Sequence, residues 1–214
     1  MKLLLTVVLN ALFWAGYAIL GRHAWFPVRQ PPILWLDNAI PFQPEPWGWV
    51  YLSQFLFTAA LPWLVDTRDR LWRYVRGLVL MSFASFVIFF FWPVASPRPA
   101  GLAAAGPMAV ILGYDGTLNA FPSLHAGFLV YMARLAWRMF GRAQPRGLST
   151  LIIVWGGAIL YATVATRQHY VIDLIAGAAV GALADWLAWR SFSEVSAATT
   201  MARRSAVASH DGCK

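Results

Sequence analysis

Long apolar segments constrain this chain more than any other feature of its sequence. Crossing a bilayer takes about 20 residues of apolar helix, with a range near 17 to 25. Six segments meet that requirement, at residues 3–20, 47–65, 74–94, 122–140, 148–165 and 170–189. Helices satisfy their own backbone hydrogen bonds, which lipid cannot do for them. The sequence therefore predicts an all-α fold, a six-transmembrane-helix bundle of an integral membrane protein.

The scarcity of charge supports this interpretation. Charged residues make up 12% of the 214 residues, whereas soluble domains carry about a quarter. We expect a single membrane-embedded domain over residues 1–190, followed by a small polar tail, 191–214, that is disordered. The single cysteine, Cys213, excludes an internal disulfide framework and a cysteine-based zinc site.

The basic residues predict the orientation in the membrane. Four of the 17 Lys and Arg residues fall in the segments between spans on one side, and the other 13 fall on the opposite side. Because basic residues concentrate in cytoplasmic loops, the rich side is cytoplasmic. Both termini then lie in the cytoplasm of a multi-pass cell-membrane protein, and loops 21–46, 95–121 and 166–169 face outward. The net charge of +8 is thus a topology signal, and no nucleic-acid partner is expected.

The first segment has a second interpretation, as a secretory signal, because Lys2 precedes its apolar run. The run is longer than most signal cores, and no small-x-small cleavage site follows before Gly21. We therefore expect residues 1–20 to be a retained helix. The orientation of the other five spans is the same in both cases.

Polar residues beside the outer ends of spans are candidates for function, because ionisable groups are costly there. His169 and Asp173 are four residues apart, a spacing that places both on one helix face. Asp173 could then accept the Nδ1 proton of His169 and leave Nε2 as a free nucleophile or base. The alternative is an ion pair that caps the start of the last span.

The start of the fourth span combines Pro122, Ser123 and His125. Proline suits the first turn of a helix, and the amides that follow it form an anion site at the positive end of the helix dipole. Ser123 would add a hydroxyl donor and His125 a proton donor. The alternative is an interfacial histidine without a function.

Arg98 and Arg167 lie on the basic-poor side, each beside another polar candidate. The planar guanidinium matches phosphate oxygens, although either arginine could simply reach the lipid headgroups. Two histidines, an aspartate and several anion donors fit phosphoryl transfer, in which positioning and charge neutralisation dominate catalysis. We expect the two imidazoles to meet across a phosphate-sized gap.

Two other chemistries fit the sequence less well. A metal centre is disfavoured, because the outer side has few carboxylates and no HExxH or DxD pattern is present. A serine hydrolase built from Ser123, His169 and Asp173 would lack the GxSxG elbow and leave both arginines unexplained. No cofactor or metal is expected.

The motifs together resemble the type 2 phosphatidic acid phosphatase superfamily. They are Arg-Pro at 98–99, Pro-Ser-x-His at 122–125 and His-x-x-x-Asp at 169–173. The residues of the last two motifs, Phe-Pro-Ser-Leu-His and Arg-Gln-His-Tyr-x-x-Asp, resemble those of the branch that includes inositol phosphorylceramide synthases and sphingomyelin synthases. The resemblance covers about residues 75–190, which would form the catalytic core.

The resemblance implies a role for each candidate residue. His169 would form a phosphohistidine, Asp173 would orient it, and His125 would protonate the departing alkoxide without any metal. The phosphate oxygens would be held by Arg98, Ser123 and Arg167. The chain departs from the phosphatase pattern, because Phe91 replaces a lysine, Thr163 replaces an arginine and Leu124 replaces a glycine. Arg167 could substitute for the missing cation.

The expected function is therefore that of a membrane lipid-phosphate phosphatase or phosphotransferase acting on the outer face. Its partners would be a lipid phosphate substrate, entering sideways from the outer leaflet, and the surrounding membrane lipids. One alternative is a transferase that moves a phospho-head-group between lipids. A second is a non-catalytic transporter or scaffold, in which the histidines relay protons or form structural pairs. The oligomeric state is not predicted.

Overall fold

The computed structural model describes residues 2–56, 63, 65–140 and 146–190. Within these ranges the chain is helical and forms no strand, which confirms the all-α prediction. The helices are α1 (Lys2–Arg22), α2 (Trp35–Ala39), α3 (Pro44–Leu52), α5 (Arg68–Phe91), α6 (Gly106–Tyr114), α7 (Leu124–Phe140) and α8 (Arg146–Ala165). A last helix, Val171–Arg190, is called the C-terminal helix here. The predicted disorder of the tail 191–214 concerns residues outside this description.

Three of the described helices are long and apolar enough to cross a membrane. They are α5, residues Gly147–Ala165 of α8, and the C-terminal helix. The six-span prediction is therefore supported only in part. The apolar part of α1 is the shorter helix Thr6–Arg22, and α7 has 17 residues, with Arg134 and Arg138 near its end. The predicted span 47–65 begins as α3, which ends at Leu52, and much of the remainder lies outside the described residues.

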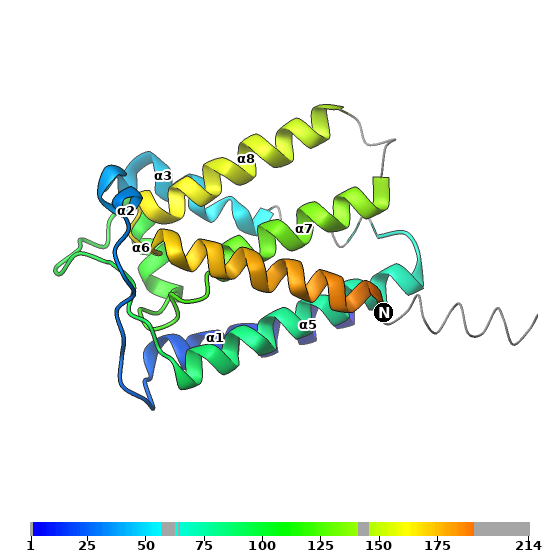
Figure 1. Ribbon diagram of the computed structural model, residues 1–214, viewed down its shortest axis with the longest axis horizontal. Helices are drawn as coiled ribbons and strands as arrows, with labels where there is room; N and C mark the ends of the chain where they lie inside the picture. The colour runs from blue at the N-terminus through cyan, green and yellow to red at the C-terminus, as the bar shows by residue number, and fades with distance from the viewer. Residues whose placement is uncertain (1, 57–62, 64, 141–145, 191–214) are drawn as a thin grey trace, which may run out of the picture.

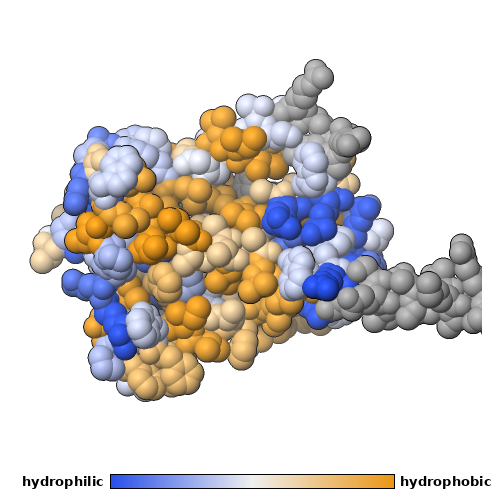
Figure 2. Space-filling model, in the orientation of Figure 1, coloured by the Kyte–Doolittle hydropathy of each residue, from blue (hydrophilic) through white to orange (hydrophobic). Residues whose placement is uncertain are grey.

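The long helices run side by side, and the short helices α2, α3 and α6 gather at one end of the bundle (Figure 1). Helix α3 packs on α6 and α8, and α5 packs on α1 and α7. Figure 2 shows hydrophobic residues over the middle of the visible face and hydrophilic residues towards its ends. Buried side chains of α1, α5 and α7, including Tyr17, Met81 and Leu135, form the main core.

Helix α7 and the C-terminal helix approach each other at glycines. A Cβ atom added at Gly177 would lie 2.8 Å from the carbonyl carbon of Ser123, and one added at Gly181 would lie 2.9 Å from the carbonyl carbon of Gly127. Carbon atoms normally pack at about 3.5 to 4.0 Å. Only glycine therefore allows these two backbones to come so close.

At the end of the bundle that carries α2, α3 and α6, extended segments of three loops are joined by backbone hydrogen bonds and a stacking contact. Isolated bridges join Arg29 to Val94 and Val94 to Asn119. The Arg29 guanidinium also stacks 3.4 Å above the Trp92 ring. These contacts hold the segment after α1 against the segments that precede α6 and α7.

The opposite end of the bundle carries a buried ion cluster. Asp185 of the C-terminal helix is fully buried and accepts hydrogen bonds from Arg134 at 2.6 Å and from Arg138 at 2.8 and 3.0 Å. Arg138 also lies over the Trp189 ring, 4.7 Å from its centroid. The cluster therefore fastens the far end of α7 to the C-terminal helix.

Candidate active site

The structure brings the two candidate histidines into direct contact. His125 is the second residue of α7, and His169 lies in the connection before the C-terminal helix. The Nε2 atom of His169 is 3.3 Å from Nδ1 of His125, and the two rings are 97% and 93% buried, respectively. The expected phosphate-sized gap is absent, because the nitrogens touch in this arrangement. Contact still brings together two imidazoles that are 44 residues apart in the sequence, one from α7 and one from the connection before the C-terminal helix.

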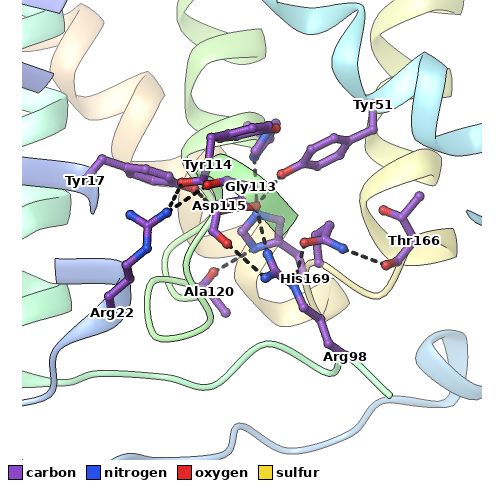
Figure 3. A network of polar contacts seen from close by, with 12 residues as sticks. Tyr17, Arg22, Tyr51, Arg98, Gly113, Tyr114, Asp115, Ala120, Thr166 and His169 are labelled. Atoms are coloured by element: carbon purple, nitrogen blue, oxygen red, sulfur yellow. Dashed lines mark hydrogen bonds and ion pairs between the residues drawn. The ribbon is translucent and has the colours of Figure 1, made fainter. Parts of the chain in front are cut away.

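The tautomer of His169 follows from its second ring nitrogen. Nδ1 lies 2.8 Å from the carbonyl oxygen of Ala120 (Figure 3). A carbonyl oxygen only accepts hydrogen bonds, so Nδ1 carries the hydrogen. The neutral ring then presents the lone pair of Nε2 towards His125, which is the arrangement that a nucleophile requires.

Asp173 does not make the hydrogen bond that its spacing from His169 predicts. Its Oδ2 atom accepts the amide of Tyr170 at 2.7 Å and stays 3.8 Å from Nδ1 of His169. The prediction from the four-residue spacing assumed that both residues lie in one helix, but His169 precedes the helix. Tyr170 is the N-cap residue, and Asp173, at the third helical position, reaches back to it as in a capping box. Asp173 therefore supplies nearby negative charge, while Ala120 orients the ring.

Ser123 caps α7, which begins at Leu124 rather than at Pro122. Its Oγ atom accepts the amide of Ala126 at 3.4 Å, and its own amide donates to the Asp173 carbonyl at 2.9 Å. The second bond joins the start of α7 to the start of the C-terminal helix. Ser123 is fully buried and lies two residues before His125 in the chain.

Arg98 lies in the same buried network, shown in Figure 3. Its Nε atom donates to Gln168 at 2.8 Å, and its Nη2 atom is 3.1 Å from Oδ2 of Asp115. A third bond runs from Nη1 to the Asp115 carbonyl at 3.0 Å. Because Gln168 directly precedes His169, the guanidinium is held close to the histidine pair.

Arg167 contacts a different part of the molecule from the one expected. Its guanidinium donates to the carbonyl oxygens of Asp37 at 2.6 Å and Ile40 at 3.2 Å. These carbonyls lie at the C-terminal end of α2, where the helix dipole attracts a cation. The described contacts therefore place Arg167 at the rim, joined to α2, and not on the histidines.

Sequence reasoning missed several residues around this pair. The Asp115 carboxylate accepts the hydroxyls of Tyr17 and Tyr51, and the Tyr51 ring lies against the His125 ring with centroids 4.3 Å apart. Asp37 is buried and accepts the amide of Val171 at 2.8 Å. Both carboxylates stand out as acids on the basic-poor side of the sequence, but no sequence pattern marks the tyrosines.

Comparison with known proteins decides the family. The family model described as PAP2 superfamily matches residues 35–187. The chain belongs to the PAP2 superfamily. The match covers all three motifs and confirms the resemblance at the level of the superfamily. The structure is also similar to the crystal structure of Aquifex aeolicus LpxE, with 15% identity, a TM-score of 0.44, and coverage of 85% of this chain and 94% of that one. No curated protein sequence matches the chain.

In this PAP2 protein a large cavity opens beside His125. It has a volume of about 850 Å³ and is mostly apolar, with walls from α1, α5 and α7. His125, Tyr17 and Tyr114 line one end of the cavity, and Thr6 and Leu71 line the other. At 1.5 Å per helical residue, the wall from Thr6 to Tyr17 is roughly 16 Å long. The cavity is thus a long apolar space that begins at a candidate catalytic side chain.

One further property of the PAP2 site bears on its chemistry. Among the described residues, no group of three or more His, Cys, Asp or Glu side chains is placed to hold a metal ion.

Proposed function

We propose that this protein is a lipid-phosphate phosphatase or phosphotransferase that works through a phosphohistidine on His169. The observation that carries the proposal is the contact between Nε2 of His169 and Nδ1 of His125 at 3.3 Å. An imidazole whose Nε2 lone pair faces a second imidazole, one acting neutral and the other carrying a proton, can form a nucleophile and general acid pair once substrate lies between them.

The proposed reaction has two steps. Nε2 of His169 attacks phosphorus, a nitrogen–phosphorus bond forms, and the phosphorus–oxygen ester bond breaks as His125 gives its proton to the departing alkoxide. The oxygen of water or of a lipid hydroxyl then attacks phosphorus while His125 takes up its proton. A new phosphorus–oxygen bond forms and the nitrogen–phosphorus bond breaks, which restores His169 and releases phosphate or a new lipid phosphate ester. A phosphoryl group does not fit between nitrogens 3.3 Å apart, so substrate binding must separate the two rings.

Positive charge and hydrogen-bond donors near the pair would stabilise the transferred group. Arg98 is held beside His169 through Gln168, and Ser123 is buried at the start of α7. We assign direct phosphate contacts to these two residues. Arg167, bound to carbonyls of α2, contributes its charge from the rim. Asp173 favours the positive charge that develops on His169 from 3.8 Å away.

The apolar cavity supports a lipid as the substrate. It begins at His125 and runs along α1 and α5, where a hydrocarbon tail would be shielded from water. In the proposed topology, residues 1–190 form one membrane domain with its catalytic core near 75–190. Both termini lie in the cytoplasm of a cell-membrane protein, and the site opens outward. The clustered arginines at the opposite end of the bundle, Arg134 and Arg138, fit a cytoplasmic side.

Transfer to a lipid acceptor is the second candidate, and the motif residues favour it. Phe91 and Thr163 replace cations of the phosphatase pattern, as in the synthase-like branch that the Phe-Pro-Ser-Leu-His motif resembles. In that case a lipid hydroxyl resolves the phosphohistidine in place of water. The two functions share the first step and differ only in the acceptor.

A panel of lipid phosphates tests the proposal. The purified protein is incubated with each lipid and a chelator, and both released phosphate and new lipid products are measured. Free phosphate indicates a phosphatase, whereas a new phospholipid indicates a transferase. Labelled substrate should also leave an acid-labile, base-stable adduct on wild type.

Two variants complete this experiment. His169→Ala should lose both the adduct and turnover, while His23→Ala should keep both, because His23 is an exposed residue of the loop after α1 whose ring contacts Trp25. No adduct and no turnover on any lipid in wild type would instead favour a transporter or scaffold.

A further inference from the structure

One carboxylate near the histidine pair binds side chains from three separate segments of the chain. Asp115, directly after α6, is 95% buried. Its Oδ1 atom accepts the Tyr17 hydroxyl at 2.7 Å, and its Oδ2 atom accepts the Tyr51 hydroxyl at 2.8 Å and pairs with Arg98 at 3.1 Å. A buried charge survives only when it is paired and hydrogen-bonded, and here each bond reaches a different part of the chain.

Tyr51 links this carboxylate to the proposed general acid. Its hydroxyl is held by Asp115, while its ring lies on the His125 ring with centroids 4.3 Å apart and planes tilted by 33°. The ring is fully buried in α3. Tyr17 makes the same kind of bond to the other oxygen of Asp115, but its ring contacts belong to Phe13, Trp14 and Phe89.

We propose that Asp115 is a positioning residue that acts in two directions, holding Arg98 for the phosphate and, through Tyr51, setting the orientation of the His125 imidazole. The proposal rests on the proposed function, in which His125 protonates the leaving group. Proton transfer needs a heavy-atom separation of about 2.6 to 3.2 Å. A ring anchored through a hydroxyl and a carboxylate is a physical means of keeping the imidazole within that range.

The choice of leaving group separates this role from a general effect on folding. An alkoxide is strongly basic and leaves only with a proton from His125. The p-nitrophenolate group is a much weaker base and leaves without that proton. The quantity kcat/KM reports the first phosphoryl transfer, in which the leaving group departs. If His125 loses its orientation, kcat/KM should therefore fall for the alkyl ester much more than for the nitrophenyl ester.

The experiment compares kcat/KM for an alkyl lipid phosphate and for a nitrophenyl phosphate that carries an alkyl chain of the same length, in wild type, Tyr51→Phe and Tyr17→Phe. Because both esters carry the same tail, a change in tail binding cancels in the ratio. Both substitutions remove one hydroxyl from Asp115, and only Tyr51 touches His125. General acid catalysis is worth about 10²- to 10⁴-fold, so Tyr51→Phe should lower the alkyl-to-aryl ratio by about tenfold and Tyr17→Phe by less than about twofold. The ratio does not depend on how much of each variant is folded.

Each outcome bears on the proposal. Equal loss on both esters in Tyr51→Phe, or an equal change of the ratio in both variants, overturns the positioning role and leaves the proposed function standing. Wild type that turns over neither ester overturns the proposed function and this role with it. A selective loss in Tyr51→Phe alone supports the role.

Discussion

The glycine contact between α7 and the C-terminal helix gives the sharpest test of the site. These two elements carry His125 and lead directly from His169, respectively. A Cβ atom at Gly177 would lie 2.8 Å from the carbonyl carbon and 3.1 Å from the amide nitrogen of Ser123. Both neighbours are backbone atoms, which cannot turn aside as a flexible side chain could. Gly177→Ala must therefore push the start of α7 away from the C-terminal helix.

The size of the effect follows from this distance. Carbon atoms pack at about 3.5 to 4.0 Å, so the helices must separate by roughly 1 Å near Ser123. A misplacement of about 1 Å in an active site can cost about a hundredfold in rate. This corresponds to about 2.7 kcal/mol of transition-state stabilisation. Overpacking should also lower stability by about 1 to 3 kcal/mol.

The assay is turnover of a lipid phosphate at saturating concentration, per mole of folded protein. Gly157→Ala in α8 is the matched control, because an added Cβ there meets no atom within 4 Å. It should keep wild-type turnover and gain slightly in stability, since alanine favours helix over glycine. Gly177→Ala with wild-type turnover would refute the inference that this close approach sets the geometry of the histidine pair.

Four other predictions follow from the site and its surroundings. The pH dependence of kcat/KM should be bell-shaped, because the proposed step needs one imidazole neutral and the other protonated; a flat profile between about pH 5 and 9 contradicts this pair. Turnover should be unchanged by a chelator, since histidines and arginines carry the proposed chemistry, and loss that added metal restores would contradict it. Arg98→Lys should raise KM about tenfold or more, because lysine cannot reproduce a planar, multiply bonded guanidinium, and an unchanged KM would remove Arg98 from the phosphate site. Arg138→Ala should lower the melting temperature more than Arg134→Ala does, because Arg138 makes two hydrogen bonds to Asp185 and also lies over the Trp189 ring. In both variants kcat per folded molecule should stay at the wild-type value.

Sequence reasoning found the histidine pair because the chemistry leaves a local trace. His125 and His169 each lie within a short motif at one end of an apolar segment, and the structure brings their rings into contact. Arg98 was found in the same way and lies in the adjoining network. Hydrophobic length also predicts helices, so the all-α fold follows from composition and apolar runs alone.

Other parts of the site depend on contacts that no local pattern encodes. Asp173 illustrates this, because its bond to Tyr170 depends on where the C-terminal helix begins, and a shift of one residue changes its partner. Tyr51 and Asp115 are 64 residues apart, and their pairing exists only once α3 and α6 pack together. Arg167 was predicted to bind phosphate from its charge, its planar guanidinium and its position beside His169, whereas in the structure it donates to carbonyls of α2.

The contact between Asp37 and Val171 has a consequence for biogenesis. The Asp37 carboxylate caps the amide of a residue that the ribosome adds 134 positions later. Until then the carboxylate can bind only the nearby Leu34 amide, and the loop that carries α2 has no such bond to the start of the C-terminal helix. The nascent chain can therefore complete this contact only when the C-terminal helix has been made and docks, and a translation product halted before that point would lack it.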